Sequence, residues 1–403
     1  MVRHVVGVKI LLVHDYGVLA GGAERVTVEI RDGMRARGHD ARLFASTAQS
    51  FPLPNQADYT CFGTNAWQRQ FLQVSNPWAV IGLRRVLKQF QPDVVHVRMF
   101  LTQLSPAILP LLGRIPAFLH VGNHQTICPI NTRTLPDESA CTFLAGVACY
   151  RQGCISALGL ARTMVQLRSW RRRRGVFRMI VANSHALAQT LRENDVPVSA
   201  IIWNGTRVVC QRPPLEDPPL IAYAGRLEPQ KGVDVLLHAM AIVAARVPTA
   251  RLHIVGEGSD RPRLQSIVDA LSIQHHVIMC GHIARPQLDE RLSKAWVQAV
   301  PSRYPEPFAN VIAEAMMRGT AMVATATGGS PEVVQEGITG YLVPSRNADA
   351  LADRLVHVLS DRALAERLGA AGRSAALNNL SVDRMLDRFE ELYAQMLGRV
   401  PAL

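Results

Sequence analysis

The sequence lacks any apolar run long enough to cross a bilayer. A membrane-spanning helix needs roughly 18 or more consecutive apolar residues, and the stretch most like a leader, VVGVKILLV (5–13), is short and interrupted by Lys9. No small-residue cleavage site follows it cleanly, so we interpret it as a first buried strand. We therefore expect the chain to be cytoplasmic.

Paired C-x-x-C motifs are also missing. The seven cysteines are an odd number, which argues against a disulfide framework. Four of them fall within one segment: Cys128, Cys141, Cys149 and Cys154. Four thiolates can hold a zinc ion tetrahedrally. Because the spacings lack metal-binding knuckles, we favour ordinary reduced thiols and keep a structural metal site as the alternative.

Two binding signatures are absent as well. There is no zinc-finger pattern and no aromatic-interleaved RNA-binding pattern, so we do not expect a nucleic-acid partner. HDYGVLAGGAE (14–24) lacks G-x-G-x-x-G after the first strand, which argues against a dinucleotide oxidoreductase. The net charge is +12, with a local excess at Arg168 and Arg171 to Arg174. Such a cluster can bind nucleic acid, anionic lipid or an anionic substrate, or it forms a solvated helix face.

What the chain does contain is a globular composition, with 48% hydrophobic and 19% charged residues. Short β-branched runs alternate with segments of helical periodicity such as 233–247. This alternation predicts parallel sheets covered by helices on both faces. The predicted strands are 9–14, 41–46, 93–99, 117–121, 178–184, 220–225, 251–256, 276–281, 297–302 and 321–326.

A proline-rich stretch, CQRPPLEDPPL (210–220), divides this pattern in two. Proline fixes φ and lacks a backbone donor, so we interpret the stretch as a linker. The predicted fold class is α/β, with doubly wound, Rossmann-like domains at 1–209 and 221–380 that face each other across a cleft. The remaining residues, 381–403, carry a periodic helix that we expect to pack back on the first domain.

The stretch YPEPFANVIAEAMM (304–317) places two carboxylates in apolar surroundings. Pro305 and Pro307 exclude a helix before about residue 308, and good helix formers predict one from 309 to 318. Glu306 then lies on a strand-to-helix loop and Glu314 inside the helix. Glu314 either accepts hydrogen bonds from a ligand diol, such as a ribose, or faces solvent.

Other strand-end loops carry chemistry suited to phosphates. The loop 225–232 holds Arg226 and Lys231 before a helix, which suits a diphosphate. Glycines let backbone N–H groups approach an anion. They occur in this loop and in two further loops: Gly225, Gly256, Gly258, Gly328 and Gly329.

In this order, the segments GRLEPQKGVDVLL, IVGEGSD, PSRYPEPFANVIAEAM, TGGSPEVV and GITGYLV resemble the C-terminal domain of the family 4 glycosyltransferases, which have GT-B architecture. EPFANVIAE matches the E-x7-E motif of that family at both glutamates. HDYGVLAGGAERV (14–26) and VANSHALAQTL resemble motifs of its first domain. The resemblance covers nearly the whole chain and is looser between about residues 50 and 175.

The resemblance implies a retaining hexosyltransferase that moves a sugar from a UDP- or GDP-linked donor to a sugar or lipid-linked acceptor, without a catalytic metal or other cofactor. By resemblance, Arg226 and Lys231 hold the diphosphate, Glu306 orients the sugar, and Glu314 accepts from the ribose. The other residues implied at the donor site are Gly225, Phe308, Ala309, Asn310, Gly328, Gly329, Gly256 and Gly258. Those implied at a phosphate or acceptor loop of the first domain are Gly21, Gly22 and Glu24.

Two features depart from the family pattern. Many relatives have glycine in place of Ala309. The usual histidine after the fourth strand corresponds either to His120 or to His124, and we prefer His120 because it ends the strand; for each, the alternative is a histidine satisfied by local backbone.

Two other functions remain open from the sequence. One is a nucleotide-sugar epimerase of the same architecture, which would isomerise the donor without an acceptor. The other is a non-catalytic nucleotide-binding or membrane-surface protein that depends on the arginine cluster. In that case Glu306→Gln would leave function intact.

Overall fold

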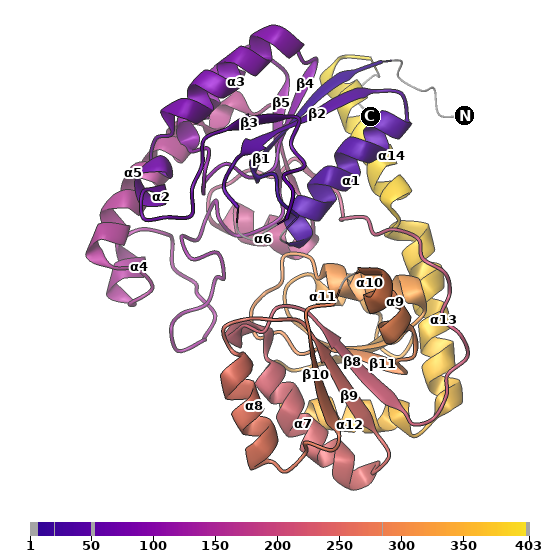
Figure 1. Cartoon of the computed structure of the whole chain (residues 1–403). Helices are drawn as coiled ribbons and strands as arrows, with labels where there is room; N and C mark the ends of the chain where they lie inside the picture. Colours follow the sequence, from indigo (N-terminus) through magenta and orange to yellow (C-terminus); the bar gives the residue numbers. More distant parts are fainter. Residues whose placement is uncertain (1–6, 20, 50–52, 284, 400–403) are drawn as a thin grey trace. The chain divides into compact units, whose positions relative to one another are not determined.

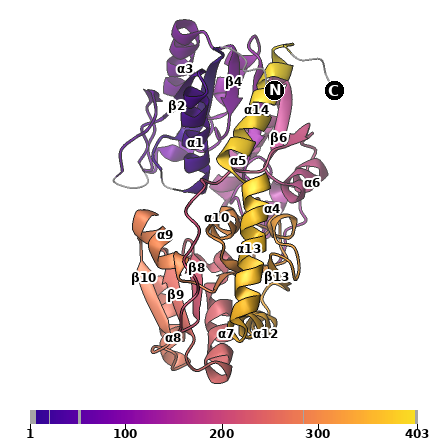
Figure 2. The ribbon, with the colours of Figure 1, turned by 90° about the vertical axis from the view of Figure 1, so that its right-hand side faces the viewer.

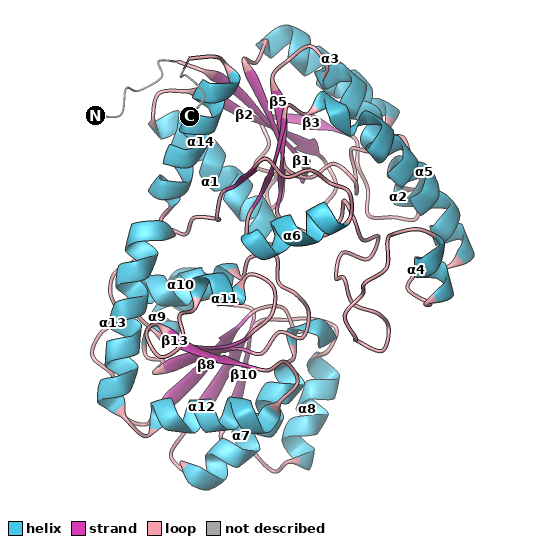
Figure 3. Cartoon of the chain, turned by 180° about the vertical axis from the view of Figure 1, so that it is seen from behind, coloured by secondary structure: helices cyan, strands magenta, loops and turns pink. Residues whose placement is uncertain are grey.

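The computed structural model describes residues 7–19, 21–49, 53–283 and 285–399. The chain divides into unit 1, residues 1–204 and 382–403, and unit 2, residues 205–381. Each contains one parallel β-sheet with helices on its faces (Figure 3), so the predicted doubly wound α/β class is confirmed. Among the residues described, no helix is both long and apolar enough to span a membrane.

Unit 1 has a seven-stranded sheet in the order β3-β2-β1-β4-β5-β6-β7. Its strands are β1 (Lys9–Tyr16), β2 (Asp40–Ser46), β3 (Tyr59–Cys61), β4 (Val94–Val97), β5 (Ala117–Val121), β6 (Met179–Ala182) and β7 (Ala200–Ile201). Its helices are α1 (Gly22–Ala36), α2 (Arg69–Leu72), α3 (Pro77–Phe90), η1 (Pro106–Leu112), α4 (Val147–Arg151), α5 (Ala157–Arg173), η2 (Arg174–Val176), α6 (His185–Glu193) and α14 (Val382–Met396).

Alternate residues of the unit 1 strands feed two separate cores. Leu11 and Val13 belong to the core under α3, α5 and η1, whereas Ile10 and Leu12 belong to the core under α1 and α14. This period of two is what a strand covered on both faces requires. The C-terminal α14 lies beside α1 (Figure 2) and contributes the buried Phe389 to that second core.

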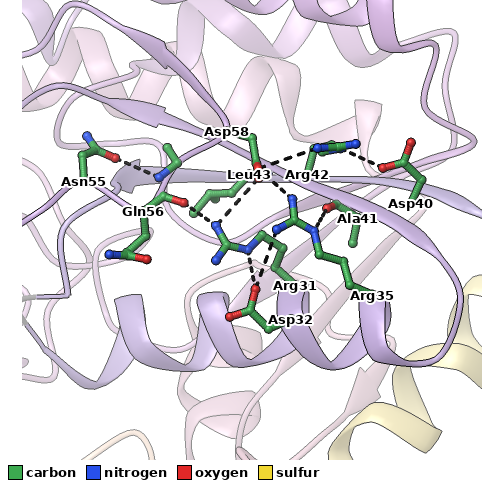
Figure 4. A network of polar contacts seen from close by, with 11 residues as sticks. Arg31, Asp32, Arg35, Asp40, Ala41, Arg42, Leu43, Asn55, Gln56 and Asp58 are labelled. Atoms are coloured by element: carbon green, nitrogen blue, oxygen red, sulfur yellow. Dashed lines mark hydrogen bonds and ion pairs between the residues drawn. The ribbon is translucent and has the colours of Figure 1, made fainter.

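A polar network fixes α1 against the strands of unit 1 (Figure 4). Asp58 accepts a hydrogen bond from Leu43 N at 2.8 Å and pairs with the Arg35 guanidinium at 2.7 Å. Arg35 also donates to Ala41 O at 2.7 Å, and Arg31 donates to the backbone of the same 55–58 loop. The network holds together α1, β2 and the chain entering β3.

Unit 2 has a six-stranded sheet in the order β10-β9-β8-β11-β12-β13. Its strands are β8 (Leu220–Ala224), β9 (Arg251–Val255), β10 (Val277–Gly281), β11 (Val297–Val300), β12 (Ala321–Thr325) and β13 (Gly340–Val343). Its helices are η3 (Pro229–Lys231), α7 (Val233–Arg246), α8 (Arg261–Ala270), α9 (Arg285–Ser293), α10 (Asn310–Arg318), α11 (Ser330–Val333), α12 (Ala348–Leu359) and α13 (Arg362–Asn379). Figure 3 shows α7, α8 and α12 on one face of this sheet and α10 on the other.

The proline-rich stretch 210–220, predicted to be an interdomain linker, packs on unit 2. Arg212 N donates to Arg318 O at 3.1 Å, and its Nε donates to Gly319 O at 2.7 Å. Leu215 is buried in the unit 2 core, and Trp296 Nε1 donates to the backbone carbonyl of Glu216, the residue after Leu215. The boundary between the units therefore falls earlier than predicted, at 204/205.

Candidate functional site

The predicted donor-site residues of unit 2 gather at the carboxyl edge of its sheet. Strands β9 and β10 are added on one side of β8 and strands β11 to β13 on the other, all in parallel, so the strand order reverses between β8 and β11. Open α/β sheets bind ligands at such a topological switch point. The loop after β8 carries Arg226 and Lys231, and the loop after β11 carries Glu306. The two loops meet at this point, because Lys231 and Glu306 touch.

Lys231 and Glu306 form a buried ion pair. Lys231 Nζ lies 2.6 Å from Glu306 Oε1, and the carboxyl side chain is only 7% exposed. Ser302 Oγ donates to the same oxygen at 2.6 Å, and Tyr304 OH donates to Oε2 at 2.8 Å. Lys231 also lies 4.9 Å from the centre of the Tyr304 ring, a cation–π distance.

These donors keep Glu306 ionised. Burial by itself would raise the pKa of the carboxyl group, but the adjacent Lys231 and the hydrogen bonds from Lys231, Ser302 and Tyr304 outweigh it, and the pKa is lowered. The Tyr304 hydroxyl responds in the opposite direction, since burial and the Glu306 charge raise its pKa. A fixed anion with a depressed pKa is unsuited to act as a general acid. Glu306 instead holds Lys231 in place.

Sequence reasoning missed Ser302 and Tyr304. Both precede Glu306 in the chain, and two hydroxyl side chains within four residues of a proline-bounded glutamate were the available signal. Their role depends on the loop curling back so that Ser302 and Tyr304 both reach the carboxylate of Glu306, a contact that hydrophobic periodicity does not predict.

Two glycines of the neighbouring loops are needed for close backbone packing. Gly328 has φ +54°, and a Cβ there would collide with the backbone of Glu306. The next residue, Gly329, donates its N–H to Glu306 O at 2.8 Å. A Cβ on Gly256 would likewise collide with the carbonyl of Gly225. In unit 2, then, these glycines bring the strand-end loops together around the ion pair.

Arg226 differs from Lys231 in being exposed. Its backbone carbonyl is fixed by the hydroxyl of buried Tyr223, at 2.9 Å. Its guanidinium lies close enough to Tyr304 to oppose the rise in the pKa of that hydroxyl. The site thus presents one exposed cation next to one that is held by a carboxylate.

Helix α10 begins one residue later than predicted, at Asn310. Its N-cap, Ala309, makes no side-chain capping bond and has an ordinary φ of −77°, so an alanine is accommodated there without left-handed strain. Phe308 is buried, and Glu314 lies half-buried inside the helix. Gly258 lies in the loop after β9, at the same edge of the sheet, and a Cβ there would collide with the Leu227 carbonyl.

In unit 1 the glycine loop opens α1 at the carboxyl edge of β1. Gly21 is the N-cap, with extended backbone (φ −155°), and exposed Gly22 is the first helical residue; Ala20 lies outside the described residues. Glu24 lies in the first turn. Burial raises the pKa of its carboxyl group, and hydrogen bonds from the Glu24 and Gly21 backbones, with the Arg98 charge, oppose that rise.

The preferred histidine, His120, lies inside β5 and is fully buried. Arg98 Nη1 lies 2.6 Å from its Nδ1, and its ring packs 5.0 Å from that of Phe389. Burial, then Arg98 and His96, lower its pKa well below the ordinary value, so the ring is neutral at pH 7. His124 is also buried, and its carbonyl accepts from Cys128 N at 2.7 Å.

Arg98 is a buried group that the sequence did not suggest. It directly follows β4, and burial lowers its pKa to about 10. As a charged donor to neutral His120, it fixes the orientation of that ring. An arginine directly after a strand of valines and one histidine was the signal available.

The four clustered cysteines are all free thiols. Burial raises the pKa of Cys149, and the thiols of Cys128 and Cys141 add to the rise; Cys154 responds in the same way. Within the described ranges no group of three or more His, Cys, Asp or Glu side chains is placed to hold a metal ion.

Comparison with known proteins gives two family matches that lie side by side along the chain. The family model "Glycosyltransferase Family 4" matches residues 20–208, and "Glycosyl transferases group 1" matches residues 211–375. An uncharacterized glycosyltransferase of Methanocaldococcus jannaschii is 31% identical over 187 residues, covering 46% of this chain and 47% of that protein.

A second relative is the GDP-mannose-dependent alpha-(1-6)-phosphatidylinositol monomannoside mannosyltransferase of Mycolicibacterium smegmatis. It is 34% identical over 171 residues, covering 41% of this chain and 45% of that protein. The chain thus spans about half the length of the curated relatives it matches.

Solved structures share the whole fold. A sucrose-phosphate synthase from Thermosynechococcus elongatus aligns with a TM-score of 0.75 at 22% identity, covering 97% of this chain and 99% of that one. Anabaena HepE in complex with UDP-glucose aligns with a TM-score of 0.69 at 19% identity, covering 96% and 100%. At these identities the likeness concerns architecture alone.

Proposed function

Because the chain belongs to the family 4 glycosyltransferases, with a group 1 domain as its second half, we propose that it transfers a sugar from a nucleoside-diphosphate donor to an acceptor hydroxyl with retention of anomeric configuration. The observation that carries the proposal is the cation pair Arg226 and Lys231 at the switch point of unit 2, with Glu306 fixing the lysine. Such a site is built for a dianionic leaving group.

The charges of the site suit the departure of a diphosphate. As the bond between the sugar and the diphosphate breaks, negative charge grows on the phosphate oxygens, and fixed cations stabilise that charge more than the ground state. Lys231 is held at its Glu306 contact before the donor arrives, so little reorganisation is needed. Arg226, being exposed, is able to fold onto the second phosphate.

Neighbouring groups bind the remaining parts of the donor, its ribose and its sugar. Glu314, five residues into α10, accepts from the ribose hydroxyls, and the backbone at Phe308 and Ala309 and at Gly328 and Gly329 contacts sugar and phosphate. Glu306 contacts the sugar through the second lone pair of Oε2, because a carboxylate oxygen can accept another hydrogen bond besides the one from Tyr304. No catalytic metal is required by this arrangement.

The donor is a uridine or guanosine nucleotide sugar. Support comes from a mannosyltransferase relative described as GDP-mannose-dependent and from a fold neighbour described in complex with UDP-glucose. The first of these also acts on a phosphatidylinositol monomannoside, which supports a lipid-linked acceptor. We place the reaction in the cytoplasm, at the inner face of the membrane, with Arg168 and Arg171 to Arg174 contacting anionic lipid.

The test is to incubate the whole chain with UDP- and GDP-sugars and a lipid extract, and to identify products by mass spectrometry and the new anomeric linkage by NMR. We expect a glycosylated acceptor with the anomeric configuration of the donor. An isomerised donor formed without acceptor would establish the epimerase instead. Transfer with inverted configuration would refute the retaining assignment.

A further inference from the structure

Unit 1 carries its positive charge in two segments that contain no carboxylate. Residues 59–92 contain four basic residues and no Asp or Glu, and residues 139–192 contain nine arginines and no Asp or Glu. The whole chain has a net charge of +12, so everything outside these two segments is close to neutral. The excess therefore belongs to the two segments that contain β3, α2, α3, α4, α5, η2, β6 and most of α6.

Three of these helices lie together on one side of the unit 1 sheet (Figures 1 and 3). Gln166 on α5 donates to Gln73 O, in the turn after α2, at 2.9 Å. Helices α3 and α5 both pack on η1. Their outer surface, which we call the α2–α3–α5 face, is continuous across the three helices.

Large apolar side chains on this face are exposed. Trp67 and Phe71 are 68% and 66% exposed, and their rings form a T-shaped pair with centroids 5.7 Å apart. Trp78 and Leu158 are 52% and 70% exposed, and Trp78 pairs with Phe62 at 5.2 Å. Ordinary globular surfaces show apolar residues singly, whereas paired exposed aromatics mark an interaction surface.

Helices α3 and α5 carry their exposed apolar and basic residues in the same order along the chain. On α3 the exposed residues run from Trp78 and Ile81 to the basic Arg84, Arg85 and Lys88. On α5 they run from Leu158 and Val165 to Arg168, Arg171 and Arg172. In each helix the outward stripe is apolar in its first half and basic in its second.

The topology places both apolar halves at the same edge. Helix α3 leads into β4 and α5 leads towards β6, and all these strands are parallel. Both helices therefore begin near the carboxyl edge of the sheet and end near its amino edge. The apolar halves lie at the edge where the Gly21–Gly22 loop opens α1.

We propose that the α2–α3–α5 face docks on an anionic lipid bilayer, with its tryptophans and aliphatic side chains entering the headgroup region and its arginines pairing with lipid phosphates. Tryptophan favours this interfacial depth, and basic side chains are attracted to anionic headgroups. The inference deepens the proposed function and rests on it: the bilayer lies along the unit 1 edge that carries the acceptor loop, which suits an acceptor whose reactive group stays at the headgroup level.

The full chain is mixed with vesicles of phosphatidylcholine alone or with phosphatidylglycerol added, and binding is followed by flotation and by tryptophan emission. We expect binding to the anionic vesicles only, with a blue shift of the emission and partial release when salt is raised about tenfold. The pair Arg168→Gln/Arg172→Gln should weaken binding about 25-fold, at about fivefold per arginine. The pair Trp67→Ser/Phe71→Ser should weaken it by about tenfold or more.

Matched substitutions outside the face serve as controls. Ile278→Ser/Ile338→Ser removes two exposed apolar residues of unit 2, and Arg367→Gln/Arg388→Gln removes two exposed arginines of α13 and α14. Both pairs should bind vesicles like the wild type. Equal loss in the controls would overturn the assignment of the face.

Two further outcomes also overturn the proposal. One is absence of binding to either vesicle type. The other is a dimer in light scattering that the Trp67→Ser/Phe71→Ser pair abolishes, since a second copy would then be the occupant. Nucleotide binding, measured on the same variants as a shift in melting temperature, reports on unit 2 independently. Loss of nucleotide binding with intact vesicle binding would refute the proposed function and leave the docking face standing.

Discussion

Removing either charge of the Lys231–Glu306 pair should destabilise unit 2, and removing both should cost less than the sum of the two single changes. In Lys231→Met, the carboxylate remains buried at 7% exposure, with only the hydroxyls of Ser302 and Tyr304 as donors. Breaking a buried pair from one side costs about 3–5 kcal/mol. Glu306→Gln leaves a half-buried lysine without its anion, and we expect about 2–3 kcal/mol.

The double variant leaves no buried charge. Lys231→Met/Glu306→Gln should therefore cost about 2 kcal/mol less than the sum of the two single changes, which is the coupling energy of the pair. Urea unfolding of the four proteins measures this cycle. Arg226→Gln is the matched control, since its side chain is exposed, and it should stay within about 0.5 kcal/mol of the wild type.

The pH dependence gives a second readout of the same pair. The folded-state pKa of Glu306 is lower than its unfolded value of about 4.5. The stability it contributes is thus present above that value and is lost as pH falls through the folded pKa. Single changes that add up within about 0.5 kcal/mol, or an acid response that Glu306→Gln shares with the wild type, would refute the reasoning.

Three other measurements address the fold around the sites. Burial lowers the pKa of His96 and His120 below the unfolded value of 6.5. The free energy of unfolding of unit 1 should therefore be highest above that pH and fall by up to about 1.4 kcal/mol per histidine at about pH 5.5. A urea-unfolding free energy that does not change with pH in this range would contradict this. Gly328→Ala should lower the free energy of unfolding by about 2 kcal/mol or more in urea and weaken nucleotide binding. Gly337→Ala, at a similar φ of +71° but in open space, should lower it by about 1 kcal/mol and leave binding unchanged. Equal costs would rule out the collision with Glu306. Asp58→Ala should cost about 1–3 kcal/mol in urea unfolding, because Leu43 N and the Arg35 guanidinium lose their acceptor, and a cost below about 0.5 kcal/mol would show that the network in Figure 4 contributes little.

The long periodic elements were predictable from the sequence because burial on both faces leaves a continuous apolar run. The ten predicted strands all occur, within a few residues of the predicted bounds. Three strands were missed: β13, which has four residues, and β3 and β7, which have only three and two. A run that short shows no period, and pairing with a neighbour decides whether it becomes a strand.

The candidate site was predictable at the level of loops and less so at the level of contacts. Motif resemblance singled out Lys231 and Glu306 and assigned each to the ligand. Their bond to each other joins residues 75 positions apart, and only the strand order brings those positions together. The proline-rich stretch shows the same limit, since Leu215 is buried in the unit 2 core and the residues around it give no pattern that predicts this.

The most direct test of the central claim is the shift in melting temperature of the full chain with UDP, GDP and ADP, compared with the same titrations on Arg226→Gln and Lys231→Met. A ligand that binds only the folded state raises stability by mass action. We predict a clear rise in melting temperature with UDP or GDP in the wild type and a much smaller rise in both variants. No rise with any nucleotide, or an equal rise in all three proteins, would contradict it.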